Sequence, residues 1–195
     1  MASRGRVRFR YPLRVILETP RLILRPITLD DVAAVHVFEG DPEVARFGST
    51  IARSLAQVDE YVRAGIASAA EEPRTVWEFG VVERDSGVLV GRVGFKRQAE
   101  PREASIWYAL RRDRWGRGYA REAMVPLVDF AFLNLGLHRV WADVDPENAP
   151  SMRVAQKLGM RQEAHHLENV CIHGEWRGTA IFAILAREWR GRASS

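Results

Sequence analysis

The chain has 195 residues, of which 47% are hydrophobic and 28% charged, with a formal net charge of +4. This length fits one domain with a sizeable core, and this composition excludes a disordered chain. No apolar run approaches the ~20 residues of a membrane span, and the first residues hold no apolar stretch typical of a secretion signal. We therefore expect a cytoplasmic protein that does not associate with membranes.

The cysteine and arginine content further limits the kinds of binding site that the chain can form. Cys171 is the single cysteine, which excludes an internal disulfide and a zinc site built on cysteines, and no other metal site is indicated. We expect Cys171 to be a small buried hydrophobic residue. Arginine outnumbers lysine 27 to 2, and arginine suits bidentate phosphate contacts. Composition alone does not choose between an anionic cofactor, an RNA-rich partner and a coding bias toward arginine.

In chain order, residues 1–17 come first, with five arginines and no acidic residue. We expect a basic N-terminal arm or edge strand there, a domain over 18–190 and a tail over 191–195. Residues 21–26 predict a strand. Capping residues then predict helices over 28–40 and 54–70, with a short helical turn opening at Asp41-Pro42. The second helix carries four apolar residues on one face: Leu55, Val58, Val62 and Ile66.

The second half of the chain alternates strands and helices. Strands are predicted over 77–82, 88–97 and 104–110, followed by a helix over 120–135 and a strand over 139–144. A helix introduced by Asn148 and Ser151 and a strand pair over 161–167 and 176–185 complete the pattern. This order predicts an α+β fold: three α/β/α layers around a mixed, mostly antiparallel central sheet.

The stretch 112–120, Arg-Asp-Arg-Trp-Gly-Arg-Gly-Tyr-Ala, lies between a predicted strand and a predicted helix. A strand, a glycine turn and a helix start direct successive backbone N–H groups at one anion, which is how a backbone binds phosphate. Glycine allows the backbone to approach closely. Five arginines surround the turn, and any of them is a candidate phosphate ligand, although a solvated surface charge is the simpler interpretation for at least three. They are Arg111, Arg112, Arg114, Arg117 and Arg121.

Several motifs in one order resemble the GCN5-related N-acetyltransferase (GNAT) family. They are Trp107–Leu110, Trp115–Ala120, Leu135–Val140, Asp145–Asn148 and Lys157–Met160. Together they are similar to the RimJ/RimL-like subgroup, the ribosomal-protein-alanine N-acetyltransferases. The resemblance covers about residues 18–190 and implies the acyl-CoA N-acyltransferase fold.

The resemblance implies an acyltransferase that moves an acetyl group from acetyl-CoA to a primary amine by direct attack. Ser151 is expected to protonate the departing thiolate, and a backbone N–H near Leu110 to polarise the carbonyl. Asn148 and Ser151 also fit a simple helix cap. Trp115 stands where the wider family often has glutamine or arginine. The residues expected to contact coenzyme A are Tyr108, Ala109, Leu110, Trp115, Gly116, Arg117, Gly118, Tyr119, Ala120, Arg121, Asn148 and Ser151.

The general base is not identified by sequence. Many relatives carry glutamate where this chain has Ser105, and Glu103, two residues earlier on the same strand face, is the first candidate. Glu78, His165 and His166 are alternatives. An α-amine has a pKa near 8, against about 10.4 for lysine, so water is enough to remove its proton. The missing base therefore favours an α-amine acceptor.

The favoured acceptor is a protein N-terminal α-amine of the ribosomal-protein type. A small amine such as a polyamine, an antibiotic or an amino acid is the alternative, and a non-catalytic RNA- or ribosome-binding module on the same fold is a third. Helices 28–40 and 54–70 and segment 165–175 are expected to wall the acceptor side, where Glu39, Asp41 and Glu43 are candidates to attract a cation. Relatives often form homodimers, although no feature of this sequence requires one.

Overall fold

The computed structural model describes residues 15–190 except 49 and 99–101. The expected basic arm therefore lies almost wholly outside the described residues, as does the expected tail, and both stay predictions. In the described part of the chain, no helix combines the length and the apolar character that crossing a bilayer requires.

Eight strands form one sheet in the order β1-β2-β3-β4-β5-β6-β8-β7. Every neighbouring pair is antiparallel except β5 and β6, which are parallel. The mixed, mostly antiparallel sheet is thus confirmed. The strands are β1 (Leu17–Glu18), β2 (Leu22–Arg25), β3 (Val76–Glu83), β4 (Leu89–Arg97), β5 (Glu103–Leu110), β6 (Arg139–Val144), β7 (Arg161–Ile172) and β8 (Glu175–Leu185).

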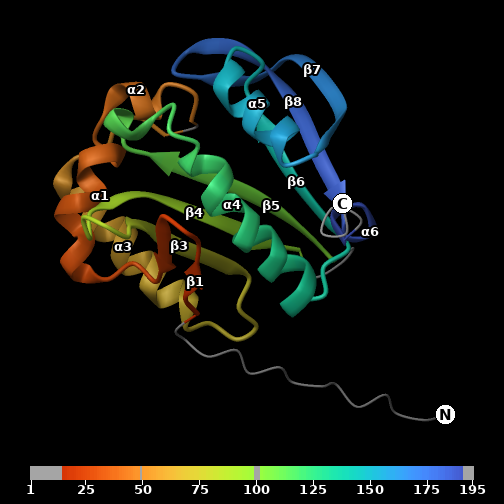
Figure 1. Ribbon diagram of the computed structural model, residues 1–195. Coiled ribbons are helices and arrows are strands. Elements are labelled where there is room, and N and C mark those ends of the chain that lie inside the picture. The colour runs from red at the N-terminus through yellow and green to blue at the C-terminus, as the bar shows by residue number, and fades with distance from the viewer. Residues whose placement is uncertain (1–14, 49, 99–101, 191–195) are drawn as a thin grey trace.

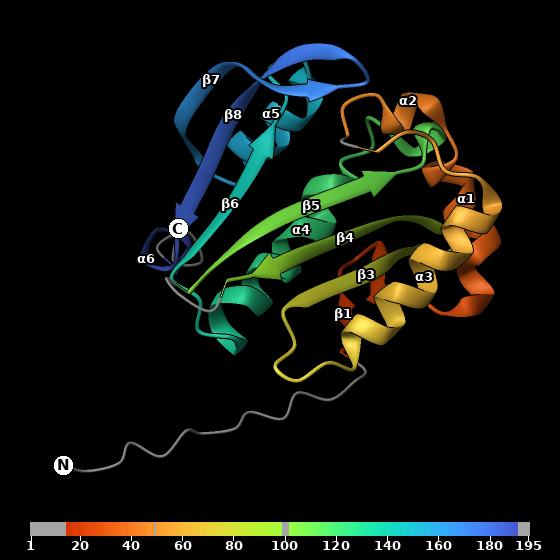
Figure 2. The ribbon, with the colours of Figure 1, turned by 180° about the vertical axis from the view of Figure 1, so that it is seen from behind.

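Helices cover both faces of the sheet, which confirms the three layers (Figures 1 and 2). One face carries α1 (Val32–Glu39) and α3 (Leu55–Ala69), and the other carries α4 (Tyr119–Asp129) and α5 (Ala149–Lys157). The shorter helices are η1 (Leu29–Asp31), α2 (Pro42–Ala45), η2 (Arg112–Arg114), the π-helical η3 (Phe130–Asn134) and α6 (Ala186–Arg190).

Local sequence signals set two helix starts between β2 and β3. Thr28 and Ser54 both form capping boxes, with Asp31 and Gln57 as the returning side chains. The predicted apolar face of α3 is only half right. Val58 and Val62 are buried, whereas Leu55 is 52% exposed and Ile66 is 41% exposed. The helix packs on α1 and β3, and on this face only Val58 and Val62, in its middle, reach the core.

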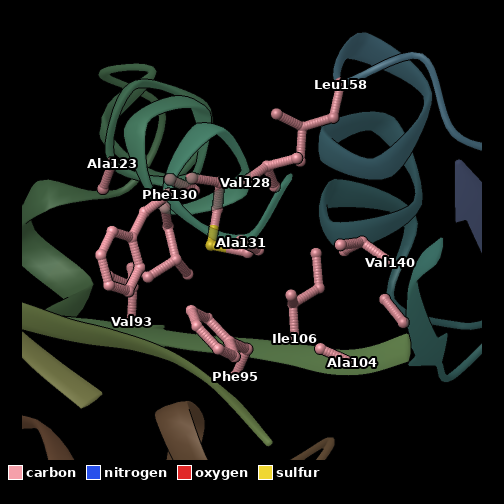
Figure 3. Packing of buried hydrophobic residues seen from close by; sticks show 14 of the residues in the cluster. Val93, Phe95, Ala104, Ile106, Ala123, Val128, Phe130, Ala131, Val140 and Leu158 are labelled. Carbon is pink, nitrogen blue, oxygen red and sulfur yellow. The ribbon is translucent and has the colours of Figure 1, made fainter. Parts of the chain in front are cut away.

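The main core lies between the sheet and α4 (Figure 3). Val93 and Phe95 of β4 and Ile106 of β5 point from the sheet toward Ala123 and Phe130. Alternate residues of the strands supply this layer because successive side chains of a strand point to opposite faces. Their other alternate residues face α1 and α3, so one strand contributes to both sides of the molecule.

Strands β5 and β6 separate after a short parallel pairing. Only Glu103, Ala104 and Ser105 pair with β6, opposite Arg139, Val140 and Trp141. Beyond that point the two strands diverge, as Figure 2 shows. The second half of β5 therefore has an unpaired edge within the sheet, and this edge is where the candidate site lies.

Candidate active site

Two clefts meet where β5 and β6 separate. The loop cleft, of about 1370 Å³, is lined by residues of the 112–120 stretch, of α4 and α5 and of the segment before β2. The helix cleft, of about 760 Å³, is lined by α1, α3, the central strands and the β7–β8 pair. Tyr108, Ala109, Asn148 and Ser151 line both clefts. These four predicted site residues therefore stand at the junction between the two spaces.

The glycine turn has the conformation that phosphate binding needs. Gly116 and Gly118 have φ values of 76° and 80°, a region that residues with a side chain rarely adopt. Gly118 is the N-cap of α4 and has no capping side chain among the described residues. The first N–H groups of α4 are therefore free to bind an anion at the positive end of the helix dipole.

Residues from the start of the domain hold this turn in place. The Glu122 carboxylate accepts hydrogen bonds from the Thr19 hydroxyl and the Arg21 Nε, both at 2.7 Å. Arg21 also donates through Nη2 to the Arg117 carbonyl at 3.1 Å. Burial acts to raise the pKa of Glu122, but the hydrogen bonds from Thr19 and Arg21 outweigh it and lower that pKa. An ionised Glu122 thus anchors the turn to β2.

Three of the five predicted phosphate-binding arginines already have carboxylate partners. Arg111 pairs with Asp113, Arg112 with Asp41, and Arg114 with both Asp113 and Glu83. This agrees with the surface-charge interpretation for three of the five. Arg117 is exposed and does not line either cleft, whereas Arg121 lines the loop cleft.

Arg153 and Lys157 were missed by the sequence reasoning. Both lie on α5, line the loop cleft and have no ion-pair partner within the described residues. Their four-residue spacing places them on one face of the helix. Arg121 Nε donates to the Lys157 carbonyl at 3.3 Å, so Arg121, Arg153 and Lys157 form a basic wall of the loop cleft. The spacing was visible in the sequence, but the face of α5 that borders the cleft was not.

The free edge of β5 offers backbone groups to the junction. Arg111 N–H donates to the Val90 carbonyl beside the Gly91–Leu110 pair. In an antiparallel ladder this directs the N–H groups of Leu110 and Tyr108 away from β4 and toward the separation from β6. The Leu110 carbonyl accepts a hydrogen bond from the Trp115 indole at 2.9 Å. Trp115 therefore fixes the end of β5 with its side chain.

Two hydroxyl groups meet across the junction. The Tyr108 hydroxyl lies 2.8 Å from Ser151 Oγ. The Asn148 side chain caps α5 by accepting the Ser151 backbone N–H at 3.2 Å, which leaves the Ser151 hydroxyl available. Burial raises the pKa of Tyr108, and the hydrogen bond with Ser151 only partly offsets this. Tyr108 thus remains a neutral hydroxyl at physiological pH.

The helix cleft contains a network of charged side chains. Arg92 donates to Glu39 at 2.6 Å and to Glu78 at 2.8 Å, and Arg53 also pairs with Glu39. Tyr61 donates its hydroxyl to Glu78. Burial raises the pKa of Tyr61, so this hydroxyl keeps its proton. Burial would lower the pKa of Arg92, but the neighbouring Tyr61, Glu78 and Glu39 outweigh burial and raise it.

Most of the carboxylates that line the helix cleft are paired with arginine. Four carboxylates line it, those of Glu39, Glu78, Asp143 and Asp145. Two arginines of the network also line it, and Arg177 pairs with Asp145 at 3.1 Å. Asp143 is exposed and has no ion-pair partner among the described residues. Asp143 is therefore the one lining carboxylate without an arginine partner in the described part of the chain, while Arg177 is shared by Asp145, Glu147 and Glu175.

The first candidate base does not reach the junction. Glu103 pairs with Arg139 at 2.6 Å and lines neither cleft. It precedes Tyr108 by five residues, or about 17 Å along an extended strand. His165 and His166 are exposed on β7 and line neither cleft, and Ser105 also lies outside both. Of the four candidates, only Glu78 lines the helix cleft.

The prediction that Cys171 is buried is wrong. Cys171 is exposed on β7, the last strand of the sheet, opposite Trp176, which is 66% exposed. Because β7 is the edge strand of the sheet and pairs with β8 alone, an apolar residue on it can lie outside the core. Within the described residues, no three histidine, cysteine, aspartate or glutamate side chains gather as metal ligands would.

Comparison with known proteins gives the family. Residues 21–161 match the family model of the acetyltransferase (GNAT) domain. The N-acetyltransferase YoaA of Bacillus subtilis is 32% identical, over 87% of this chain and 96% of that protein. The structure of Mycobacterium smegmatis RimJ in complex with CoA-disulfide superimposes with a TM-score of 0.77, at 26% identity over 90% of this chain and 88% of that one.

A second solved structure shows the limit of fold comparison. The spermidine N-acetyltransferase of Vibrio cholerae, in complex with CoA and spermine, also gives a TM-score of 0.77, at 20% identity over 88% of this chain and 99% of that one. Two enzymes with different names thus match the backbone equally well, so the fold does not identify the acceptor. The family model and the YoaA match show that this chain belongs to the GNAT family of acetyl-CoA-dependent N-acetyltransferases.

Proposed function

We propose that this acetyltransferase modifies the N-terminal α-amine of a protein, as its RimJ-like resemblance suggests. The observation that carries the proposal is the pairing of charges in the helix cleft, where arginines pair with three of the four lining carboxylates and Asp143 alone has no such partner among the described residues. A polyamine with several positive charges would need several unpaired carboxylates. A peptide N-terminus brings one positive charge, which matches the cleft.

The loop cleft has the features needed for coenzyme A. The N–H groups from Gly116 to Ala120 are proposed to bind the pyrophosphate, because the glycine conformations and the uncapped start of α4 form an anion site. The basic wall of Arg121, Arg153 and Lys157 is proposed to hold the 3′-phosphate. The free edge of β5 is proposed to bind the pantetheine amides in the manner of an added strand.

Acetyl-CoA supplies a thioester carbonyl and, once the acetyl group has moved, a thiolate. The backbone N–H of Leu110 is proposed to donate to the carbonyl oxygen, where negative charge develops as the amine attacks. The Ser151 hydroxyl is proposed to donate its proton to the thiolate. Tyr108, held neutral by burial, would donate to Ser151 Oγ and replace that proton, and the proton that the attacking amine releases to water would return to Tyr108. The relay needs no charged side chain at the junction.

No side chain at the junction is required as a base. An α-amine has a pKa near 8, so a substantial part is neutral at physiological pH and water can accept the remaining proton. Glu103 is not carried forward in this role because it is paired with Arg139 outside both clefts. The proposed reaction therefore depends on α-amine acceptors more than on a general base.

The test is an acceptor screen with the purified protein and acetyl-CoA. Peptides with varied first residues are compared with the same peptides blocked at the N-terminus, with spermidine and with lysine, and release of free coenzyme A is measured. Turnover of unblocked peptides at rates well above those of polyamines supports the proposal. Turnover of small amines alone contradicts it. Failure with every amine, together with RNA binding that weakens steeply in salt, would instead indicate a binding module.

A further inference from the structure

Glu78 is held in an unusual way at the floor of the helix cleft. Its Oε1 accepts hydrogen bonds from the Tyr61 hydroxyl at 2.5 Å, from Arg92 at 2.8 Å and from the Trp107 indole at 3.1 Å. Its Oε2 has no hydrogen-bond partner among the residues that the structure describes. One oxygen is thus fully occupied while the other is left open.

The sheet is arranged so that these three donors, here called the clamp, can reach Glu78 Oε1. Glu78, Gly94 and Trp107 lie in one row across β3, β4 and β5. A Cβ at Gly94 would lie 2.6 Å from the Trp107 ring, so only glycine lets the indole cross β4 and reach Glu78. The side of Oε2 is also kept open. A Cβ at Gly65 of α3 would lie 3.9 Å from Oε2, with no other atom within 4 Å.

The three donors hold the Glu78 carboxylate in one orientation. All of them, the Arg92 guanidinium included, converge on Oε1. Their convergence on Oε1 also fixes the direction of Oε2, because a carboxylate is planar. Glu78 lines the cleft beside the residues of the junction. A positively charged amine that enters the cleft is therefore attracted toward Glu78, in the row that crosses β3, β4 and β5.

We propose that Glu78 Oε2 binds the ammonium group of the acceptor and positions it in the helix cleft before it loses its proton and attacks. This role rests on the proposed acetyl transfer and makes Glu78 a determinant of acceptor binding, separate from the Tyr108–Ser151 relay. The cation then passes its proton to water of the cleft, so no proton remains on Glu78.

The first test separates binding from chemistry. Glu78→Gln keeps an oxygen for the three donors but removes the charge. We expect the KM of the acceptor to rise about tenfold or more, with kcat and the KM of acetyl-CoA changed little. Glu103→Gln, on the same sheet but outside both clefts, is the matched control and should change neither constant. A loss of kcat at constant acceptor KM would overturn the proposal, as would an unchanged enzyme.

A second variant guards against a folding artefact. Gly65→Leu leaves the clamp intact and fills the space beside Oε2, so it should also raise the acceptor KM while the thermal midpoint stays at or above that of the parent. Asp143→Asn tests the competing carboxylate of the cleft. If Asp143→Asn raises the acceptor KM and both other variants leave it unchanged, the ammonium site lies at Asp143 and the proposal is wrong.

A binding measurement makes the result independent of turnover. Calorimetry on the protein saturated with coenzyme A compares a peptide beginning with alanine with its deaminated, N-propionyl analogue. The parent should prefer the free amine by about tenfold or more, and Glu78→Gln should lose that preference. If the acceptor screen finds a small amine instead, the same pair is made from that amine and its deaminated analogue. An equal affinity of the parent for both members of a pair overturns the ammonium site.

Discussion

The two clefts offer different kinds of groups to the ligands proposed for them. The loop cleft is formed largely by one contiguous stretch and offers backbone N–H groups from a glycine turn and a helix start. The helix cleft is formed by side chains from α1, α3, β3, β4 and β5, which a charge network holds together. Most substitutions leave backbone donors in place, whereas each side-chain contact is lost with its residue. One fold can therefore keep its donor while the acceptor changes.

The largest expected effect comes from a substitution that disrupts the loop cleft and leaves the helix cleft unchanged. Gly118→Val forces a β-branched residue into a left-handed conformation at the start of α4, and the turn must rearrange. Losing one or two charge-assisted hydrogen bonds to phosphate should weaken coenzyme A binding about 100-fold by calorimetry. Gly136→Val is the matched control, with a φ of 64° and open space but no place in either cleft. It should lower stability similarly and leave affinity unchanged.

Ser151→Ala tests the junction between the clefts. The Asn148 cap acts on the Ser151 backbone N–H, so the helix start survives the substitution. Loss of a positioned acid should lower kcat by about 100-fold, with the KM of acetyl-CoA within about twofold. Steady-state kinetics with the best acceptor measures both constants. An unchanged kcat would contradict the acid role and would reduce Ser151 to a cap residue.

Tyr108→Phe asks whether the second hydroxyl of the junction takes part. It removes a single neutral hydrogen bond to Ser151 Oγ and retains the ring. We expect kcat to fall about 2- to 10-fold, less than for Ser151→Ala. The double variant Tyr108→Phe/Ser151→Ala should be no slower than Ser151→Ala, because both hydroxyls act in one relay. Additive losses would show that Tyr108 acts independently of Ser151.

The smallest effect on activity is expected at Asp31, which precedes α1 and lies outside both the helix cleft and its charge network. Burial acts to raise the pKa of Asp31, but hydrogen bonds from Arg25 and Thr28 outweigh it and lower that pKa. The stabilisation is therefore present above the unfolded pKa of about 3.9 and is lost as pH falls through the lower folded value. Asp31→Asn should cost about 1–3 kcal/mol at pH 7, and this cost should fade toward pH 3.

Denaturant unfolding at several pH values measures this difference, and KM for both substrates should not change. An Asp31→Asn cost that persists at pH 3 would show that shape, not charge, makes the contribution. A raised acceptor KM would show that the position of α1 controls the helix cleft directly. Either result sharpens the contrast with the loop cleft, whose turn is anchored separately by Arg21 and Glu122.

Local signals in the sequence predicted much of this protein. Ser54, Thr28 and Asn148 each begin a helix through contacts within three residues of the chain. The glycine turn could be predicted for the same reason, because its proposed function depends on backbone groups that are neighbours in the sequence. The expectations from the sequence were wrong where the exposure of a side chain depends on contacts with residues far away in the chain. Cys171 and Ile66 are apolar positions that the fold leaves at its edge.

The acceptor side was decided by the tertiary structure. Glu103 and Glu78 were both candidate bases by strand position, but β6 supplies Arg139 to the first and β4 supplies Arg92 to the second. The sequence contains both glutamates, but it does not show which arginine pairs with each of them. Trp107 reaches Glu78 only because Gly94 lies between them in the assembled sheet. Strand pairing sets these contacts between residues far apart in the chain. The sequence therefore determined the glycine turn proposed to bind the donor, and only the fold determined which carboxylate lines the cleft proposed for the acceptor.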